Sequence, residues 1–366
     1  MLKRSFGVAA VTAAAALLLA ACSSGSDTAA SEDTAAGAAS GLACVILPDS
    51  ASSPRWENGD RPALKEALEA AGFTTDIQNA EGDTAKMLTI GDQMLASGCN
   101  VMIITDYQGA GAQVAAKSKA QGVPTIAYDR PIEGVDYYVS FDNVTVGTLQ
   151  GEGILKCLAD AGKDPKTAEL IFLDGDPTDG NAAMFAEGYD TALKAAGVEV
   201  DKAKLGAKRP DGSWDGAKAG TNFEQALTAN GGKVDAVVSA NDTNAASAIA
   251  ILDKNKLTVP VSGQDASKEG MNNVLSGKQC MTVFKDYLVE ASTAADLAIA
   301  ILKGETPTTN KQLADGTPFQ AADPQALYAD AASLEGFKAA LDRSGLTAAD
   351  VCTGDAAAKC TEIGLS

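Results

Sequence analysis

Short runs rich in apolar residues alternate with amphipathic stretches along most of this chain. Each run is about four residues long and is flanked by polar or turn-forming residues, a pattern typical of strands in a buried sheet. The predicted strands are residues 44–47, 74–77, 101–104, 125–128, 138–141, 170–173, 236–239, 259–262 and 281–284.

Segments with helical periodicity separate most of these strands. One begins at Asp83 and another at Thr243. Their apolar residues fall on one face, Met87, Ile90, Met94 and Leu95 in the first and Ala245, Ile249 and Leu252 in the second. Strands that alternate with helices predict parallel sheets with helices on both faces, so the fold class is α/β. About 325 residues follow residue 40, more than a single core usually takes, and we expect two lobes.

Polar residues cluster where the predicted strands end. The clusters are residues 48–50, 105–107, 129–130, 142–143, 174–176, 241–242 and 264–265. In doubly wound sheets the ligand lies beyond the carboxyl ends of the strands, so the clusters favour a small polar ligand between two lobes. The alternative for any single residue is that it caps a helix or forms a turn.

The N-terminus has the pattern of an export signal. Lys3 and Arg4 precede an apolar stretch over residues 8–19, and Leu-Ala-Ala-Cys follows at residues 19–22. We interpret residues 1–21 as a signal peptide and Cys22 as a lipidated cysteine that becomes the mature N-terminus. The alternative is a stray cysteine after an ordinary signal. Residues 22–40 then form the lipid anchor and a flexible tether, since no large apolar residue occurs from 23 to 40. The expected location is the outer face of the cytoplasmic membrane.

Charge and composition exclude several classes of function. The formal net charge is −19, and loss of Lys3 and Arg4 with the signal makes it −21, so nucleic acid is an unsuitable partner. Histidine is absent, which removes the Ser-His-Asp and Cys-His nucleophiles and the usual zinc ligand. The acidic run from Asp174 to Asp179 has Thr178 where a calcium ligand should fall. No metal, no cofactor and no catalysis are expected.

Six cysteines remain after Cys22, and an even number in an exported domain indicates disulfides with 15 possible connectivities. Cys352 and Cys360 enclose a short polar loop and are expected to pair. Cys44 opens the first strand and Cys99 precedes the third, which is its neighbour in a doubly wound sheet, so these two are also expected to pair. Cys157 ends a helix of the second lobe and Cys280 begins a strand that returns from it, which completes the predicted set.

Seven stretches carry a resemblance to a known family. They are Ser-Pro-Arg-Trp at 53–56, Ile-Ala-Tyr-Asp-Arg-Pro at 126–131, Ser-Phe-Asp-Asn at 140–143, Asp-Gly-Asn-Ala at 179–182, Val-Val-Ser-Ala-Asn-Asp at 237–242, Ser-Gly-Gln-Asp-Ala at 262–266 and Met-Thr-Val-Phe-Lys at 281–285. In this order and spacing, from about residue 43 to about 345, the chain resembles the type I periplasmic sugar-binding proteins of ABC importers, most closely those for D-xylose and related aldoses. Residues 352–366 have no counterpart in the pattern.

The resemblance implies two doubly wound parallel-sheet lobes joined by a hinge. The N-terminal lobe would comprise residues 41–142 and 284–324, and the C-terminal lobe residues 143–283 and 325–366. The sugar contacts that it implies are Arg55, Trp56, Asp129, Arg130, Asp179, Asn181, Trp214, Asn241, Asp265 and Lys285. Trp214 lies in a loop that does not align cleanly.

The chemistry of these residues suits a sugar. Carboxylates and amides bind adjacent hydroxyls in pairs, and arginine or lysine donates charge-assisted bonds to sugar oxygens. Indole rings cover the apolar face of a pyranose, and the chain has two tryptophans. The alternative for Trp56 is a place in the core, although its neighbours are too polar for a core strand.

The resemblance therefore predicts a monomeric lipoprotein that captures a monosaccharide, most specifically D-xylose, and delivers it to an ABC permease with a cytoplasmic ATPase. One alternative is a receptor for arabinose, galactose or glucose that serves a sensory or chemotaxis partner through the same cleft. Another is a glycosidase that uses Asp129 and Asp265 as paired carboxylates. A transcriptional repressor of related fold is excluded by the export signal and by the absence of a basic DNA-binding segment.

Overall fold

A computed structural model of the protein describes residues 41–50, 53 and 55–365. The predicted signal peptide, Cys22 and the tether lie outside the described residues. The described residues fall in a single unit that spans residues 39–366.

The first lobe, here the N-terminal lobe, is built on a seven-stranded sheet with the order β2-β1-β3-β4-β5-β10-β9. All neighbours in it are parallel except β10 and β9. The strands are β1 (Leu42–Leu47), β2 (Thr74–Asn79), β3 (Val101–Ile104), β4 (Thr125–Tyr128), β5 (Tyr137–Phe141), β9 (Lys311–Gln312) and β10 (Pro318–Ala322). The short strands β9 and β10 come from a segment for which the sequence pattern predicts no strand.

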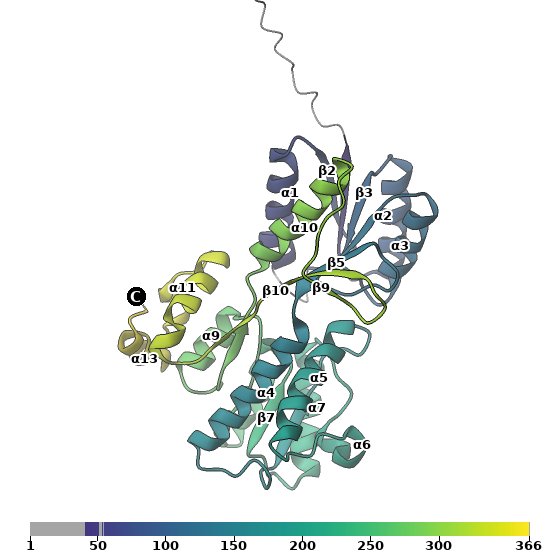
Figure 1. The fold of residues 1–366 in the computed structure, drawn as a ribbon. Helices are drawn as coiled ribbons and strands as arrows, with labels where there is room; N and C mark the ends of the chain where they lie inside the picture. Colours follow the sequence, from purple (N-terminus) through teal and green to yellow (C-terminus); the bar gives the residue numbers. More distant parts are fainter. Residues whose placement is uncertain (1–40, 51–52, 54, 366) are drawn as a thin grey trace, which may run out of the picture. The chain divides into compact units, whose positions relative to one another are not determined.

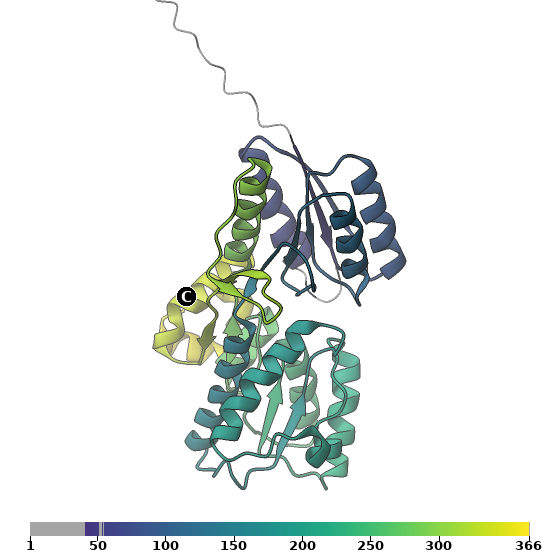
Figure 2. The same cartoon turned by 45° about the vertical axis from the view of Figure 1, so that its right-hand side comes forward.

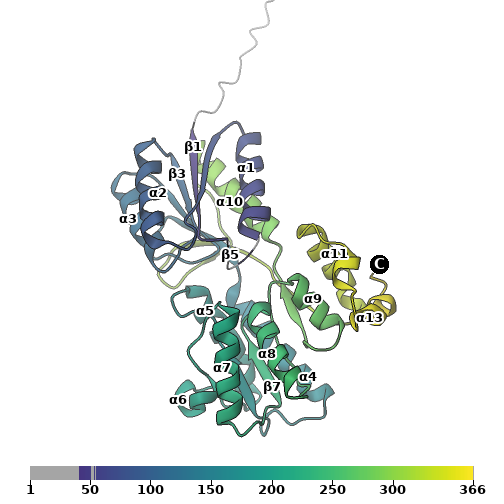
Figure 3. The same ribbon diagram turned by 180° about the vertical axis from the view of Figure 1, so that it is seen from behind.

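Helices cover both faces of this sheet, as Figures 1 and 3 show. On one face α1 (Arg61–Ala70) and α10 (Tyr287–Leu302) share a core with alternate residues of β1, β3 and β4. On the other face α2 (Thr84–Ala96) and α3 (Ala110–Ala120) pack on the remaining residues of those strands. Burial on both faces explains why the central strands are continuously apolar.

The second lobe, here the C-terminal lobe, has a smaller set of strands. The parallel pair β6 (Leu170–Leu173) and β7 (Ala236–Ser239) and the antiparallel pair β8 (Thr282–Phe284) and β11 (Gln325–Leu327) are its regular elements. Single bridges from Val261 to Val237 and from Gln264 to Val283 connect the two pairs. The strand predicted at residues 259–262 is wrong as a regular element: Pro260 has no N–H to donate, and Ser262 Oγ accepts the N–H of Ser239 in place of a backbone oxygen.

Two helix pairs enclose β6 and β7. The helices α4 (Asn143–Asp160) and α5 (Gly180–Ala195) pack on one side, and α7 (Gly216–Ala229) and α8 (Asp242–Lys254) pack on the other. The short helix α6 (Lys202–Leu205) precedes α7.

The C-terminal segment forms a helical cluster with its own core. It consists of α11 (Leu334–Arg343), α12 (Ala348–Val351) and α13 (Ala356–Ile363), which pack with α9 (Lys268–Leu275) around Phe337. Figure 2 shows this cluster at the end of the colour range, beside the C-terminal lobe. No helix within the described residues combines the length and hydrophobicity that a membrane span requires.

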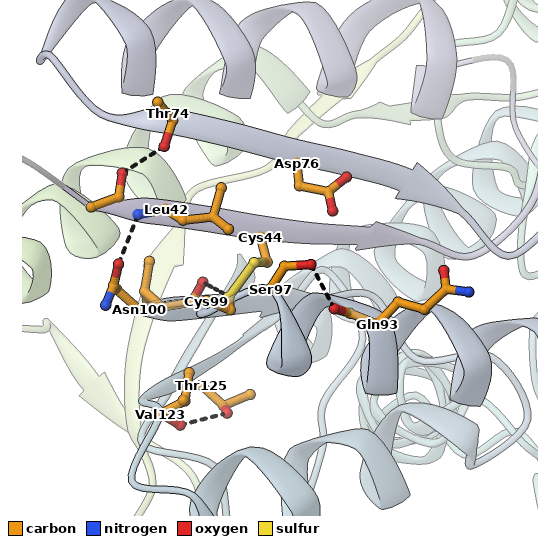
Figure 4. Close-up of a disulfide and its surroundings, with 12 residues drawn as sticks. Leu42, Cys44, Thr74, Asp76, Gln93, Ser97, Cys99, Asn100, Val123 and Thr125 are labelled. Carbon is orange, nitrogen blue, oxygen red and sulfur yellow. Dashed lines mark hydrogen bonds between the residues drawn. A yellow bond between two sulfur atoms is a disulfide. The ribbon is translucent and has the colours of Figure 1, made fainter. Parts of the chain in front are cut away.

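The cysteines pair as Cys44–Cys99, Cys157–Cys280 and Cys352–Cys360, which are the three predicted pairs. Figure 4 shows how the first pair joins β1 to the segment before β3. Beside it the side chain of Asn100 accepts a hydrogen bond from the N–H of Leu42 at 2.8 Å. The disulfide and this bond tie the start of the first strand to its central neighbour.

The chain passes between the lobes at three places. These are the step from β5 to α4, the step from β8 to α10 and the step from β10 to β11.

Candidate binding site

All ten side chains predicted to contact a ligand line a single cavity of about 60 Å³. They come from segments far apart in the sequence. They meet because the carboxyl ends of the strands of both lobes face the cavity. The predicted residues in its lining are Arg55, Trp56, Asp129, Arg130, Asp179, Asn181, Trp214, Asn241, Asp265 and Lys285, and Ser53, Phe185 and Gln264 complete it.

Arg55 is held by three carboxylates of the N-terminal lobe. Its guanidinium lies 2.8 Å from Asp60, 2.6 Å from Glu290 and 3.2 Å from Asp129. Asp60 also accepts a hydrogen bond from the hydroxyl of Tyr128. Burial raises the pKa of Asp60 and raises that of Glu290 well above its usual range, although Arg55 opposes both shifts. Asp60 and Glu290 therefore fix Arg55 from behind and leave its other face toward the cavity.

Trp56 has two roles. Its side chain is 3 % exposed and packs in the core of the N-terminal lobe, and the same ring also lines the cavity. The guanidinium of Arg55 lies 4.4 Å from its ring centre. The core position and the cavity position, which are alternatives on the sequence alone, are therefore compatible for Trp56.

Asp129 lies at a constrained point of the backbone. Its φ of 62° is in the left-handed region that non-glycine residues avoid. The carbonyl of Asp129 accepts hydrogen bonds from Tyr138, Ser140 and Asn181, and these bonds hold that conformation. Burial opposes ionisation, but the charges of Arg55, Lys285 and Arg130 outweigh it, so the pKa of Asp129 is lowered.

Asp179 and Asn181 connect the two lobes. Asp179 accepts the N–H of Asn181 at the start of α5, and its carboxylate lies 3.3 Å from the guanidinium of Arg130. The indole N–H of Trp214 donates to the same carboxylate at 3.1 Å. Asn181 donates to the carbonyl of Asp129 at 2.9 Å. Both residues come from the C-terminal lobe and contact residues of the N-terminal lobe, so these contacts depend on how closely the lobes approach.

The remaining predicted residues belong to or follow strands of the C-terminal lobe. Asn241 accepts the N–H of Asn244 and caps α8, which is the alternative that the sequence left open for such residues. Asp265 is solvent-exposed at the cavity rim and pairs with Lys285 at 3.2 Å. The ammonium of Lys285 lies 5.6 Å from the ring centre of Phe185.

Sequence reasoning missed Gln264 and Phe185. Gln264 is 3 % exposed, and its side-chain oxygen has no hydrogen-bond partner within the described part of the chain. Phe185 meets Trp214 edge-on, with ring centres 6.3 Å apart. The signal for Gln264 was its place beside Asp265 in a strand-end cluster, whereas Phe185, one turn into α5, gave no signal apart from helical spacing.

A wider cleft of about 740 Å³ adjoins the cavity. Arg130, Asp179 and Trp214 line both spaces. The other charged residues of the wider cleft are mostly acidic, namely Asp49, Glu81, Asp106, Asp176 and Asp215, with Lys218 as a basic residue. The cleft beside the cavity therefore has a mostly acidic surface.

The sequence profile of the periplasmic binding protein domain matches residues 44–306. The chain is 33 % identical to the D-xylose-binding periplasmic protein of Escherichia coli over 267 residues, which is 72 % of this chain and 78 % of that protein. It is 32 % identical to the multiple sugar-binding periplasmic receptor ChvE of Rhizobium radiobacter, with 74 % and 80 % of the two chains covered.

Solved structures of similar fold give the same grouping. An ABC transporter solute-binding protein from Clostridium phytofermentans with bound β-D-glucose has a TM-score of 0.70 and 30 % identity, and the match covers 83 % of this chain and 97 % of that one. A carbohydrate transporter solute-binding protein from Chloroflexus aurantiacus in complex with D-glucose has a TM-score of 0.71 and 26 % identity, with 85 % and 98 % covered.

Proposed function

The chain belongs to the periplasmic binding protein family, and on that premise we propose that it captures a monosaccharide outside the cytoplasm and delivers it to the permease of an ABC importer. The proposed ligand is D-xylose. The identity to D-xylose-binding proteins supports that choice, and the relatives described as multiple sugar-binding support a broader aldose receptor as the alternative.

The observation that carries the proposal is the make-up of the cavity. Three cations line it, Arg55, Arg130 and Lys285, and three carboxylates accompany them, Asp129, Asp179 and Asp265. The formal charges cancel, so the cavity suits a neutral ligand with many hydroxyls that donate and accept. Aromatic rings of Trp56, Trp214 and Phe185 supply apolar surface for the C–H faces of a sugar ring. Such a site binds and releases its ligand without covalent chemistry.

Delivery to a permease requires two distinguishable states. We propose that the lobes comprise residues 41–142 with 284–324 and residues 143–283 with 325–366, and that the three steps between them form the hinge. The contacts of Asp179 with Arg130 and of Asn181 with Asp129 would break when the lobes separate. A sugar that touches both lobes would favour the closed state, which a permease or a sensory partner could recognise.

A panel of monosaccharides tests the ligand. Thermal unfolding is measured with D-xylose, L-arabinose, D-galactose and D-glucose, and with D-glucuronate as a charged control. A sugar at 100 times its Kd adds about 2.7 kcal/mol to the free energy of unfolding, so the melting temperature should rise clearly with D-xylose and stay unchanged with D-glucuronate. No shift with any neutral sugar would overturn the proposal, and release of aryl groups from aryl xylosides would favour a glycosidase.

The N-terminal pattern supports a lipid anchor at Cys22, which is part of the proposal. Cys22→Ser leaves the export signal intact and removes the thiol that lipidation requires. The variant should move from the membrane fraction to the soluble extracytoplasmic fraction, with unchanged affinity for sugar. Unchanged membrane association of Cys22→Ser would refute the anchor while leaving the binding function untouched.

A further inference from the structure

Asp242 is a buried carboxyl group that does not line the cavity. It is the first residue of α8, directly after Asn241, and is 1 % exposed. Its oxygens accept hydrogen bonds from the N–H of Ser267 at 2.8 Å, from the amide of Gln279 at 2.8 Å and from the hydroxyl of Thr282 at 2.9 Å. These donors lie 25 to 40 residues further along the chain, so the group joins separate segments.

Two glycines leave room for this carboxyl group. A Cβ on Gly270 would lie 2.0 Å from an oxygen of Asp242, and a Cβ on Gly263 would lie 2.3 Å from the other. Gly263 and Gly270 flank the segment that carries Asp265. The backbone on both sides of that segment therefore closes directly on Asp242.

The segment itself has a conformation that needs support. Asp265 has a φ of 98° and Ala266 a φ of 46°, both in the left-handed region that side-chain-bearing residues avoid. Each of the three successive N–H groups is hydrogen-bonded: Asp265 to the carbonyl of Val283, Ala266 to the hydroxyl of Thr282, and Ser267 to Asp242. Asp242 makes the last of these bonds directly and, through Thr282, fixes the acceptor of the second.

We infer that Asp242 is a positioning residue for the sugar site. It holds the strained turn at Asp265–Ser267, so that the carboxylate of Asp265 points into the cavity beside Lys285. The inference rests on the proposed function. It goes beyond that function because Asp242 touches no ligand and acts only through Asp265. An ordinary helix cap would stabilise α8 and have no effect on affinity.

The test is a double-mutant cycle measured by calorimetry with D-xylose and with D-glucose at pH 8. Asp265→Ala should weaken binding by about ten- to a hundredfold, the cost of a charged hydrogen bond. Asp242→Asn replaces one acceptor with a donor that faces other donors, and should weaken binding about tenfold. In the double variant the loss should be within about twofold of that of Asp265→Ala alone, because Asp242 acts through Asp265.

Two further variants keep the test decisive. Thr282→Val removes the link between Asp242 and Ala266 and should likewise weaken binding. Combined with Asp265→Ala, it should cause no further loss of affinity. Asn272→Ala is the matched control, because Asn272 lies on α9, the helix that follows the turn, and donates to the carbonyls of Val351 and Thr353 rather than to the turn. This control should lower the melting temperature and leave affinity unchanged.

The outcomes separate this inference from the proposed function. If wild type binds neither sugar, the proposed function fails and the inference falls with it. If wild type binds and Asp242→Asn or Thr282→Val binds equally well, the inference alone is overturned. Additive losses in the double variant would also overturn it, because they would show that Asp242 affects binding by a route other than Asp265.

Discussion

In both lobes, buried carboxyl groups contact the segments that carry the charged residues of the cavity. Asp60 and Glu290 stand behind Arg55, and Asp242 stands behind the turn that carries Asp265. Burying a charge costs free energy unless it is paired. Each of these carboxyl groups therefore contacts a cation or several hydrogen-bond donors. Under the proposed function, the orientation of the residues that touch the sugar would depend on residues that do not touch it.

At the residue scale this arrangement predicts a dependence of stability on pH. Burial, followed by the negative charge of Asp265, raises the pKa of Asp242 to about 7, against about 3.9 for an unfolded chain. Between these pKa values the folded state keeps a proton that the unfolded state has lost. The contribution of Asp242 to the free energy of unfolding is therefore fully present below about pH 4, falls as pH rises toward 7, and is constant above it.

Urea unfolding at pH 5 and pH 8 checks this prediction. The amide side chain that the variant Asp242→Asn introduces cannot titrate. Between pH 5 and pH 8 the free energy of unfolding of wild type should therefore fall relative to that of the variant, by a few kcal/mol at most. Asp235→Asn is a control, because Asp235 is more exposed and its pKa is lowered by hydrogen bonds from the Glu169 N–H and Lys163. A difference between wild type and Asp242→Asn that is independent of pH would contradict the shift.

At the scale of elements, the packing of α4 on α5 positions cavity-lining residues of the C-terminal lobe. Asn181 and Phe185 lie on α5, and α4 follows directly from the first lobe. The helices approach so closely that a Cβ on Gly147 would lie 2.0 Å from the carbonyl oxygen of Phe185, and a Cβ on Gly188 would lie 2.1 Å from that of Val144. The two helices can be this close only because both positions lack a side chain.

Gly147→Ala should therefore lower the free energy of unfolding by about 1–3 kcal/mol, because the backbone of α5 must move to admit the methyl group. The matched control is Gly220→Ala in α7, where the nearest atom to a new Cβ is 3.6 Å away. Since glycine in a helix interior is less stable than alanine, the control should be neutral or stabilising by roughly 0.5–1 kcal/mol. Equal effects of the two changes on the melting temperature would refute the packing argument.

At the scale of the molecule, none of the three disulfides among the described residues joins one lobe to the other. Cys44–Cys99 lies within the N-terminal lobe, Cys157–Cys280 within the C-terminal lobe and Cys352–Cys360 within the C-terminal helices. The contacts that join the lobes across the cavity are instead hydrogen bonds and ion pairs, such as those of Asp179 and Asn181. Strong cross-links within lobes and reversible contacts between them suit a receptor that opens and closes.

Removal of individual disulfides tests their separate contributions. Cys157 and Cys280 are 123 residues apart and Cys352 and Cys360 are 8 apart. In the chain-entropy description the longer loop constrains the unfolded state more, by roughly 2 kcal/mol. The double variant Cys157→Ala/Cys280→Ala should therefore melt at a lower temperature than Cys352→Ala/Cys360→Ala. The reverse order would show that native-state contacts of the C-terminal helices outweigh loop entropy.

The sequence by itself determined the central elements of both lobes. The predicted ranges 101–104, 125–128, 170–173 and 236–239 coincide with β3, β4, β6 and β7, because strands buried on both faces are continuously apolar. The helix predicted from Asp83 is α2, and the side chain of Asp83 caps it. Residue types at the strand ends, together with the resemblance to a known family, also identified the ten side chains that line the cavity.

Only the tertiary structure decided the features that depend on partners far away in the chain. The strands β9, β10 and β11 are short and mostly polar or half-buried, so pairing with β5 and β8 rather than periodicity makes them strands. The local pattern also gave no sign that residues 259–262 would form a single bridge, or that the side-chain oxygen of Gln264 would be buried with no hydrogen-bond partner among the described residues. The sequence places Asp242 in a strand-end cluster with ligand contact and helix capping left open, because Ser267, Gln279 and Thr282 reach its carboxyl group only after folding. Residue type and local pattern determine which side chains are chemically suited to a binding site, and long-range contacts determine which of them lie together in one.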